Sequence, residues 1–242
     1  MTLRLVLCLP VLLAGVPVTP AGAQGAFSLP AGCTAFVTMQ KRSCVVSHLF
    51  TCEGDPEGYQ RRVDLTEAGL TYAGMIDAET QWIESHYAGS GQSDTLAPDP
   101  IDAASLSELL ETGVDTWDFR TLTDDSLVTR HQGSDRLTGR VVTIDGVALQ
   151  ETAFEATVLD AAGIQLWRLE GTEYIHPEWR TFISGTRTVT MPDEVYDTDF
   201  TPVEFIFPAE PGFLGSMPRH DCGVVMSRLE PAPIPVMWSA GE

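Results

Sequence analysis

A single dipeptide, Asp145-Gly146, constrains the fold of this chain more than any other feature of its sequence. It separates two stretches in which apolar and polar residues alternate, 136–144 and 147–158. Asp-Gly suits a two-residue hairpin turn, because both of its positions accept a positive φ angle. The two stretches are therefore expected to pair as antiparallel strands, with Ile144 opposite Val147.

A second turn, Asp160–Gly163, predicts a third strand beside these two, over 164–171. In the registers that the two turns set, Glu155 lies opposite both Arg136 and Arg168. One face of the sheet is then charged and is expected to be in solvent. The other face is apolar and is expected to be buried. It carries Leu137, Val141, Phe154, Ala156, Val158, Trp167 and Leu169.

The same reasoning predicts strands in the rest of the chain. Residues 59–67 and 70–77 flank Ala68-Gly69, and a two-residue loop there places Val63 opposite Gly74. Other strands are expected at 33–40, 45–52, 80–87, 164–174, 180–190 and 203–207. The chain is therefore expected to be mainly β: an antiparallel meander curled into a half-open barrel or a sandwich.

One short amphipathic helix is expected near 103–114, after a loop of small and polar residues at 89–100. Asp102 is one candidate for its N-cap. Ser105 and Glu108 form an alternative capping box one turn later. Apolar residues at helical spacing would lay this helix on the sheet: Leu106, Leu109, Leu110 and Val114.

The first residues have the pattern of a secretory signal peptide. Arg4 provides the positive charge, 5–16 the apolar stretch and Ala21-Gly22-Ala23 the small residues of a cleavage site. The apolar stretch is shorter than the roughly 20 residues that span a bilayer, and no later segment is long enough either. Removal of 1–23 predicts a periplasmic or secreted protein without a transmembrane segment. Lipidation of Cys33 is an alternative.

Composition divides the rest of the chain into two parts. Residues 24–207 are expected to form the β domain with its inserted helix. Proline recurs through 208–242, and proline cannot donate to a sheet ladder. This segment is therefore expected to run extended over the surface or away from the domain, with recognition by a partner as an alternative.

Four cysteines follow the signal: Cys33, Cys44, Cys52 and Cys222. In an oxidising compartment they predict two disulfides, with three possible connectivities. If the first two predicted strands form a hairpin, Cys33 falls opposite Cys52, with Cβ atoms about 5 Å apart. Cys44, at the turn, would then pair with Cys222.

No cofactor, metal ligand or catalytic residue is predicted. The spacing Cys44-x3-His48-x3-Cys52 separates its members by about 13 Å along a strand, too far for one zinc ion. The acidic stretch 193–199 lacks the glycine and terminal glutamate of a calcium-binding loop, so a solvated loop is expected. The histidines share no motif, and no GxSxG, HExxH or P-loop pattern occurs. A hydrolase with dispersed catalytic residues stays an alternative.

The net charge of −20 at pH 7 argues against nucleic acid and anionic membranes as partners, because both require basic surfaces. What remains is a large apolar sheet face, able to hold an acyl chain, another lipid or an apolar small molecule. Its candidate ligand-facing residues are Tyr59, Tyr72, Ile76, Phe154, Trp167, Phe182 and Phe205.

In overall layout, an exported antiparallel meander with an inserted amphipathic helix resembles the half-open barrels of periplasmic lipoprotein carriers. The resemblance implies a binding or carrier function in the cell envelope, and it transfers no site residue. The sequence equally fits a structural or protein-interaction domain of the envelope, whose sheet face is filled by its own side chains.

Overall fold

The computed structural model describes residues 25–124 and 126–223, and this part of the chain contains thirteen strands and one helix. The helix is α1 (Leu106–Thr112). In chain order, the strands are β1 (Cys33–Lys41), β2 (Val45–Cys52), β3 (Gln60–Thr66), β4 (Gly69–Ile76), β5 (Trp82–Tyr87), β6 (Gln92–Leu96), β7 (Val114–Thr123), β8 (Leu127–Ile144), β9 (Val147–Leu159), β10 (Gln165–His176), β11 (Thr181–Thr190), β12 (Val195–Asp199) and β13 (Pro202–Ile206).

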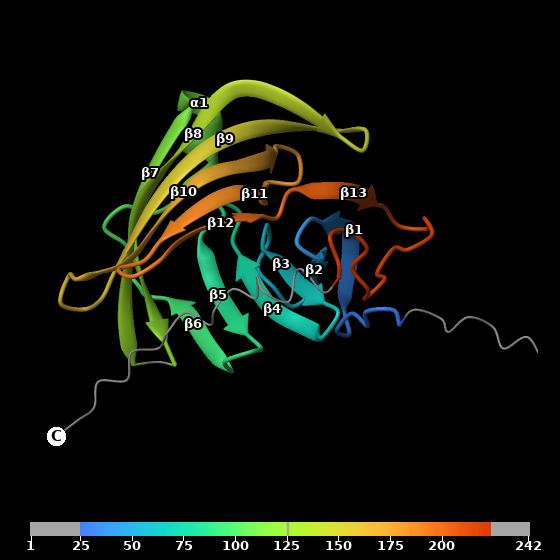
Figure 1. Ribbon diagram of the computed structural model, residues 1–242, viewed down its shortest axis with the longest axis horizontal. Helices are drawn as coiled ribbons and strands as arrows, with labels where there is room; N and C mark the ends of the chain where they lie inside the picture. Colours follow the sequence, from blue (N-terminus) through green and yellow to red (C-terminus); the bar gives the residue numbers. More distant parts are fainter. Residues whose placement is uncertain (1–24, 125, 224–242) are drawn as a thin grey trace, which may run out of the picture.

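The strands form one curled antiparallel sheet, in the order β12-β11-β10-β9-β8-β7-β6-β5-β4-β3-β2-β1-β13. In Figure 1, the strands from β7 to β11 arch over those from β2 to β5. A buried cluster joins distant strands through the curl, because Val37 of β1 packs with Leu149 of β9 and Ile183 of β11. The sheet is not closed into a barrel, since β12 and β13 are its edges. The predicted mainly β meander with one short helix is therefore confirmed.

The hairpin β8–β9 has the predicted turn, with Ile144 opposite Val147, but a bulge interrupts β8 at residues 138–140. Beyond the bulge, the register differs by two residues from the predicted one. Arg136 therefore lies opposite Ala153. Bulges of this kind are invisible to an alternation pattern, because they insert residues without breaking the strand.

Two side chains with predicted positions lie at or beside the bulge, and the structure contradicts the prediction for one of them. Val141, which was expected in the buried face, is 68% exposed, so this prediction is wrong. Arg140 still donates to Glu151 Oε1 at 3.1 Å, the partner that the hairpin register predicts. The long arginine side chain spans the interruption.

The pairing of β9 with β10 is also displaced by two residues, so that Ala156 lies opposite Leu169 rather than Trp167. A shift of two residues leaves every side chain on its own face. Arg168 and Glu155 are accordingly exposed, and they form an ion pair at 3.1 Å. On the predicted apolar face, Ala156 and Val158 are buried. Four other residues of that face are half-buried: Leu137, Phe154, Trp167 and Leu169.

The hairpin β3–β4 turns one residue earlier than predicted, which alone would displace its pairs by two residues. A register shift between Asp64 and Leu65 takes back one of these, so Val63 lies opposite Ala73, one residue away from its predicted partner. A one-residue shift moves every side chain of a strand to the other face of the sheet. Tyr72 therefore lies opposite Asp64, on the face away from Val63.

Three strands lie where the sequence predicted none. Strand β6 lies within the expected loop 89–100, β7 begins where the expected helix ends, and β12 lies in the expected acidic loop 193–199. Strand β8 also begins well before residue 136. The short strands β6 and β12 are mostly polar, so their neighbours in the sheet, rather than their own alternation, set their conformation.

Helix α1 is shorter than predicted, and Ser105 rather than Asp102 is its N-cap. The backbone N–H of Glu108 donates to Ser105 Oγ at 3.2 Å. This is the capping arrangement that the alternative position predicted. The apolar side of the helix packs against β10 in a cluster of Leu106, Leu109 and Ile175.

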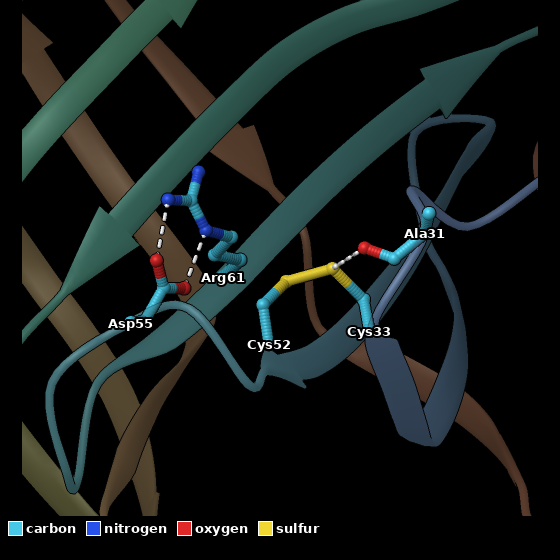
Figure 2. Close-up of a disulfide and its surroundings, with 5 residues drawn as sticks. All are labelled: Ala31, Cys33, Cys52, Asp55 and Arg61. Atoms are coloured by element: carbon cyan, nitrogen blue, oxygen red, sulfur yellow. Dashed lines mark hydrogen bonds and ion pairs between the residues drawn. A yellow bond between two sulfur atoms is a disulfide. The ribbon is translucent and has the colours of Figure 1, made fainter.

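The structure pairs Cys33 with Cys52 and Cys44 with Cys222, which is the connectivity predicted from the sequence. Figure 2 shows the first disulfide, which joins β1 to β2. The second disulfide joins the turn between these strands to a segment 178 residues later in the chain.

That segment, residues 207–222, is termed the C-terminal strap. It follows a series of turns along β1 rather than an extended path. The backbone N–H of Leu214 donates to Thr38 Oγ1 at 2.9 Å, and that of Arg219 donates to Gln40 Oε1 at 3.0 Å. The expected signal peptide and the rest of the proline-rich segment lie outside the described residues. Within the described ranges, no helix combines the length and apolarity needed to cross a bilayer.

Candidate binding site on the concave face

The two faces of β3 have different surroundings. Val63 packs under Phe27 and Phe213 on the outer side of the sheet. Arg62 alternates with it and points to the concave side. There the charge of Glu173 influences the pKa of Arg62, although Glu173 belongs to β10, seven positions from β3 in the sheet order. Two such strands come close only across the interior of the curl.

Five charged side chains face this concave side, and together they are termed the interior charge cluster. They come from β1, β3, β10 and β11, and each influences the pKa of at least one other member. The members are Lys41, Arg62, Asp64, Glu173 and Arg187.

Lys41 is the only lysine of the chain, and it is 3% exposed. Desolvation lowers its pKa to about 8, although the charge of Asp64 partly opposes that effect. Its Nζ lies 5.7 Å from the ring centroid of Phe200, within the range of a cation–π contact. Among the described residues, no hydrogen bond or ion pair reaches this Nζ.

Arg62 and Asp64 form the centre of the cluster. Asp64 accepts a hydrogen bond from Ser47 Oγ at 2.6 Å and lies 3.4 Å from Arg62 Nε. Burial alone would raise the pKa of Asp64, but the charges of Arg62 and Lys41 outweigh it and hold that pKa below its usual value. The Arg62 guanidinium also lies 4.7 Å from the ring centroid of Tyr72. The Arg62 side chain is nevertheless 33% accessible.

Glu173 and Arg187 complete the cluster from the opposite side of the curl. Desolvation, followed by the charge of Asp135, raises the pKa of Glu173 to about 7. Arg187 lies 5.4 Å from the ring centroid of Phe200 and donates through Nε to Thr198 Oγ1 at 3.2 Å. Both Lys41 and Arg187 therefore contact the ring of Phe200.

An aromatic group lies on β7 and β8, beside Asp135. Trp117 Nε1 donates to Asp135 at 2.9 Å, and Phe119 stacks on His131 with ring centroids 5.1 Å apart. Trp82 of β5 packs against Phe119 at 5.4 Å and is 45% exposed. Apolar and aromatic side chains thus accompany the charges on the concave side.

The seven residues predicted as an apolar ligand face lie in several places. Tyr72 contacts the interior charge cluster through Arg62, and Ile76 lies opposite Trp82. Phe205 and Phe182 belong to two separate buried clusters. The remaining three are half-buried: Tyr59 beside a surface hollow, Phe154 on β9 and Trp167 on β10.

The charged members of the site were missed by sequence reasoning. An alternation pattern assigns charged residues to solvent, and the misplaced turn at β3–β4 separated Tyr72 from its neighbour Asp64. One signal was available: Arg62 and Asp64 alternate with Val63 and Leu65 in β3, so the apolar pair and the charged pair had to face opposite sides.

A surface groove of about 570 Å³ lies outside the cluster. It is lined by the β8–β9 turn and the β10–β11 turn, with His176 stacked on Trp179 at a centroid distance of 3.8 Å. Phe207 forms another part of its wall. The groove is open and has a mixed polar and apolar lining.

The histidines and acidic groups form other contacts. His86 Nδ1 lies 3.0 Å from Ser93 Oγ, and His220 Nε2 lies 2.9 Å from Glu204. Within the described ranges, one group of potential metal ligands lies close together: Cys44, Glu67 and Cys222. Its two sulfurs are bonded to each other, so they offer no thiolate to a metal ion.

The interior charge cluster is thus the part of the structure best equipped for binding. It offers three cationic groups and two carboxyl groups in a desolvated setting, where electrostatic interactions are stronger than in water. Comparison with protein-family models, with curated proteins and with solved structures finds no match to this chain.

Proposed function

We propose that the chain is an exported binding or carrier protein of the cell envelope, whose concave sheet face holds an acyl chain or another amphipathic small molecule. One observation carries the proposal: Arg62 faces the concave side among aromatic and charged neighbours and still keeps 33% of its side chain accessible. Ligand sites combine apolar walls with a few polar groups of this kind. The two disulfides support an oxidising compartment.

The experiment is native mass spectrometry of the protein purified from the exported fraction, followed by extraction with organic solvent. We expect a co-purifying amphipathic molecule, and the extracted protein should bind a fluorescent fatty-acid probe. Tyr72→Ser should weaken probe binding, because Tyr72 lies under Arg62 on the concave side. The control is Val141→Ser, at an exposed position of β8. Extracted protein that binds no amphipathic probe would contradict the proposal.

The alternative function is protein interaction, and the surface groove beside His176 and Trp179 favours it. An open groove with an aromatic wall can receive a side chain of a partner protein. Trp179→Ala would then abolish partner binding and leave probe binding on the concave face unchanged. Loss of probe binding in this variant would argue against a separate role for the groove.

A further inference from the structure

The distribution of positive charge in this chain is unusual. The sequence has 34 acidic and 14 basic residues, yet its only lysine and two of its arginines belong to the interior charge cluster. Taking a charge out of water is unfavourable unless a partner compensates for it. Three cations on the concave side therefore call for anionic partners.

Residues of the protein itself do not accept hydrogen bonds from all the donor groups of these three cations. Among the described residues, the contact of Lys41 Nζ is with the ring of Phe200, and no hydrogen bond or ion pair reaches it. Arg62 Nε lies 3.4 Å from Asp64 but makes no hydrogen bond. Arg187 makes one side-chain hydrogen bond, through Nε to Thr198. Lys41 is more than nine-tenths buried, so bulk water does not solvate its whole side chain. These groups have donors left for a ligand.

The carboxyl groups near the cations do not balance their charge. Asp64 already accepts from Ser47 and pairs with Arg62. Glu173, with a pKa raised to about 7, is only partly ionised at neutral pH. Within the five residues of the interior charge cluster, the three cations therefore exceed the ionised carboxylates, and an added monoanion would reduce this excess. Asp135, outside the cluster, offsets part of it.

Apolar side chains adjoin the cluster directly. Tyr72 of β4 lies against the Arg62 guanidinium and is half-buried, so part of its ring stays accessible. Phe200 lies against both Lys41 and Arg187. A molecule with its anionic end at these cations would therefore find apolar contacts next to them.

We infer that Lys41, Arg62 and Arg187 bind the carboxylate of a long-chain acid, whose acyl chain lies along the adjoining apolar side chains. The inference rests on the proposed function and specifies its ligand. Charge-assisted hydrogen bonds to a carboxylate are stronger than neutral ones. Because the cluster is desolvated, its cations attract an anion more strongly than they would in water, and this attraction favours a carboxylate over a neutral head group of the same size.

The test compares four probes by isothermal titration of the solvent-extracted protein: dodecanoate, dodecanol, dodecyl phosphate and acetate. Dodecanoate should bind at least about tenfold more tightly than dodecanol, and also more tightly than the other two. Lys41→Met and Arg62→Gln should each remove this preference. Arg136→Gln, which removes one charge from an exposed outer position, should leave it unchanged.

A second readout needs no substitution. Because the chain has one lysine, protein labelled with ¹³C at lysine Cε should give a single lysine signal. Dodecanoate should shift this signal, and dodecanol should not. Equal affinity for dodecanoate and dodecanol, or an unmoved signal at saturating dodecanoate, would overturn the inference and leave the carrier function standing.

The remaining outcomes are also decisive. Acetate binding as tight as dodecanoate binding would show a small-anion site and overturn the long-chain ligand. Tighter binding of dodecyl phosphate than of dodecanoate would show that the site prefers a phosphate group, and would overturn the carboxylate ligand. If neither dodecanoate nor dodecanol binds, both the inference and the proposed function fail.

Discussion

Several buried polar side chains of this protein are held by specific hydrogen bonds. Asp135 accepts from Trp117 Nε1 at 2.9 Å, and His131 Nε2 lies 3.0 Å from Thr121 Oγ1. Desolvation raises the pKa of Asp135 to about 6 and lowers the pKa of His131 to about 4. Burial therefore favours the neutral form of both groups, and this preference makes stability depend on pH.

Asp135→Asn should increase stability at high pH. The folded-state pKa of Asp135, about 6, exceeds the usual value of about 4. The folded protein therefore holds more protons between these values than the unfolded chain does, and ionisation of Asp135 costs stability as the pH rises through this window. Urea denaturation should show equal stability near pH 4 and an advantage of about 1–3 kcal/mol for the variant at pH 8.

Asp118→Asn provides the control with the opposite sign. Its hydrogen bond with Arg130 holds the pKa of Asp118 below its usual value, so the ionised form stabilises the fold above the unfolded pKa. This variant should be less stable than the wild type at pH 8, and the difference should shrink as the pH falls through the folded-state pKa. An Asp135→Asn variant that is also less stable at pH 8 would contradict our assignment.

Gly133→Ala should destabilise the protein by about 1–3 kcal/mol. A Cβ atom at Gly133 would overlap the carbonyl oxygen of Glu155 and the ring of Trp117, and neither can move away freely. The control is Gly89→Ala, because a Cβ atom at Gly89 meets nothing within 4 Å. Equal denaturation midpoints for the two variants would show that Trp117 does not pack tightly over Gly133.

For single residues, sequence reasoning predicted the positions of surface charges better than those of interior charges. Arg168 and Glu155 were placed in solvent, and they are exposed. Lys41 and Asp64 escaped notice, because patterning assigns a charge to water unless another strand supplies a partner for it. Asp64 has its partners on β2 and β3. Glu173 and Arg187, which influence Lys41 from β10 and β11, are far away in the sequence, and only the curl of the sheet brings them near.

At the scale of elements, turn chemistry was a better guide than register. Asp145-Gly146 fixed the first pair of β8–β9, but the bulge at 138–140 displaced the later pairs by two residues. The β3–β4 turn was placed one residue late, and this error together with the register shift between Asp64 and Leu65 exchanged the faces of β4. Local sequence indicates where a chain reverses, whereas cross-strand packing decides how far the strands slide.

Ser105→Ala should destabilise the protein by about 1–2 kcal/mol. Ser105 Oγ accepts from the Glu108 N–H and donates to Glu79 at 3.1 Å, so the substitution removes a cap and a link between α1 and the β4–β5 turn. Thermal unfolding should show the loss. Ser126→Ala, at an exposed turn position, is the control and should change the midpoint much less.

At the scale of the whole molecule, two features bring distant segments together. The curl packs β1 against β9 and β11, and the C-terminal strap returns to β1. The cysteine positions predicted the return of the strap, because one pairing followed from hairpin geometry and left the other by elimination. The curl itself was expected only as a half-open barrel or a sandwich, because the sequence contains no signal for the depth of curvature.

Replacing both Cys44 and Cys222 by serine should cost more stability than replacing both Cys33 and Cys52. In the chain-entropy model, closing the 178-residue separation stabilises the fold by about 5 kcal/mol and closing the 19-residue separation by about 3 kcal/mol. Guanidinium denaturation of the two double variants, each under oxidising conditions, measures the difference.

The two variants should also differ in where the structure opens. Without Cys44–Cys222, only non-covalent contacts hold the C-terminal strap, such as the hydrogen bonds of Leu214 with Thr38 and of Arg219 with Gln40. These contacts can break without unfolding of the sheet. Hydrogen exchange at the Leu214 and Arg219 amides should therefore become faster in that variant alone. Unchanged exchange at these amides would mean that packing, rather than the disulfide, holds the strap against β1.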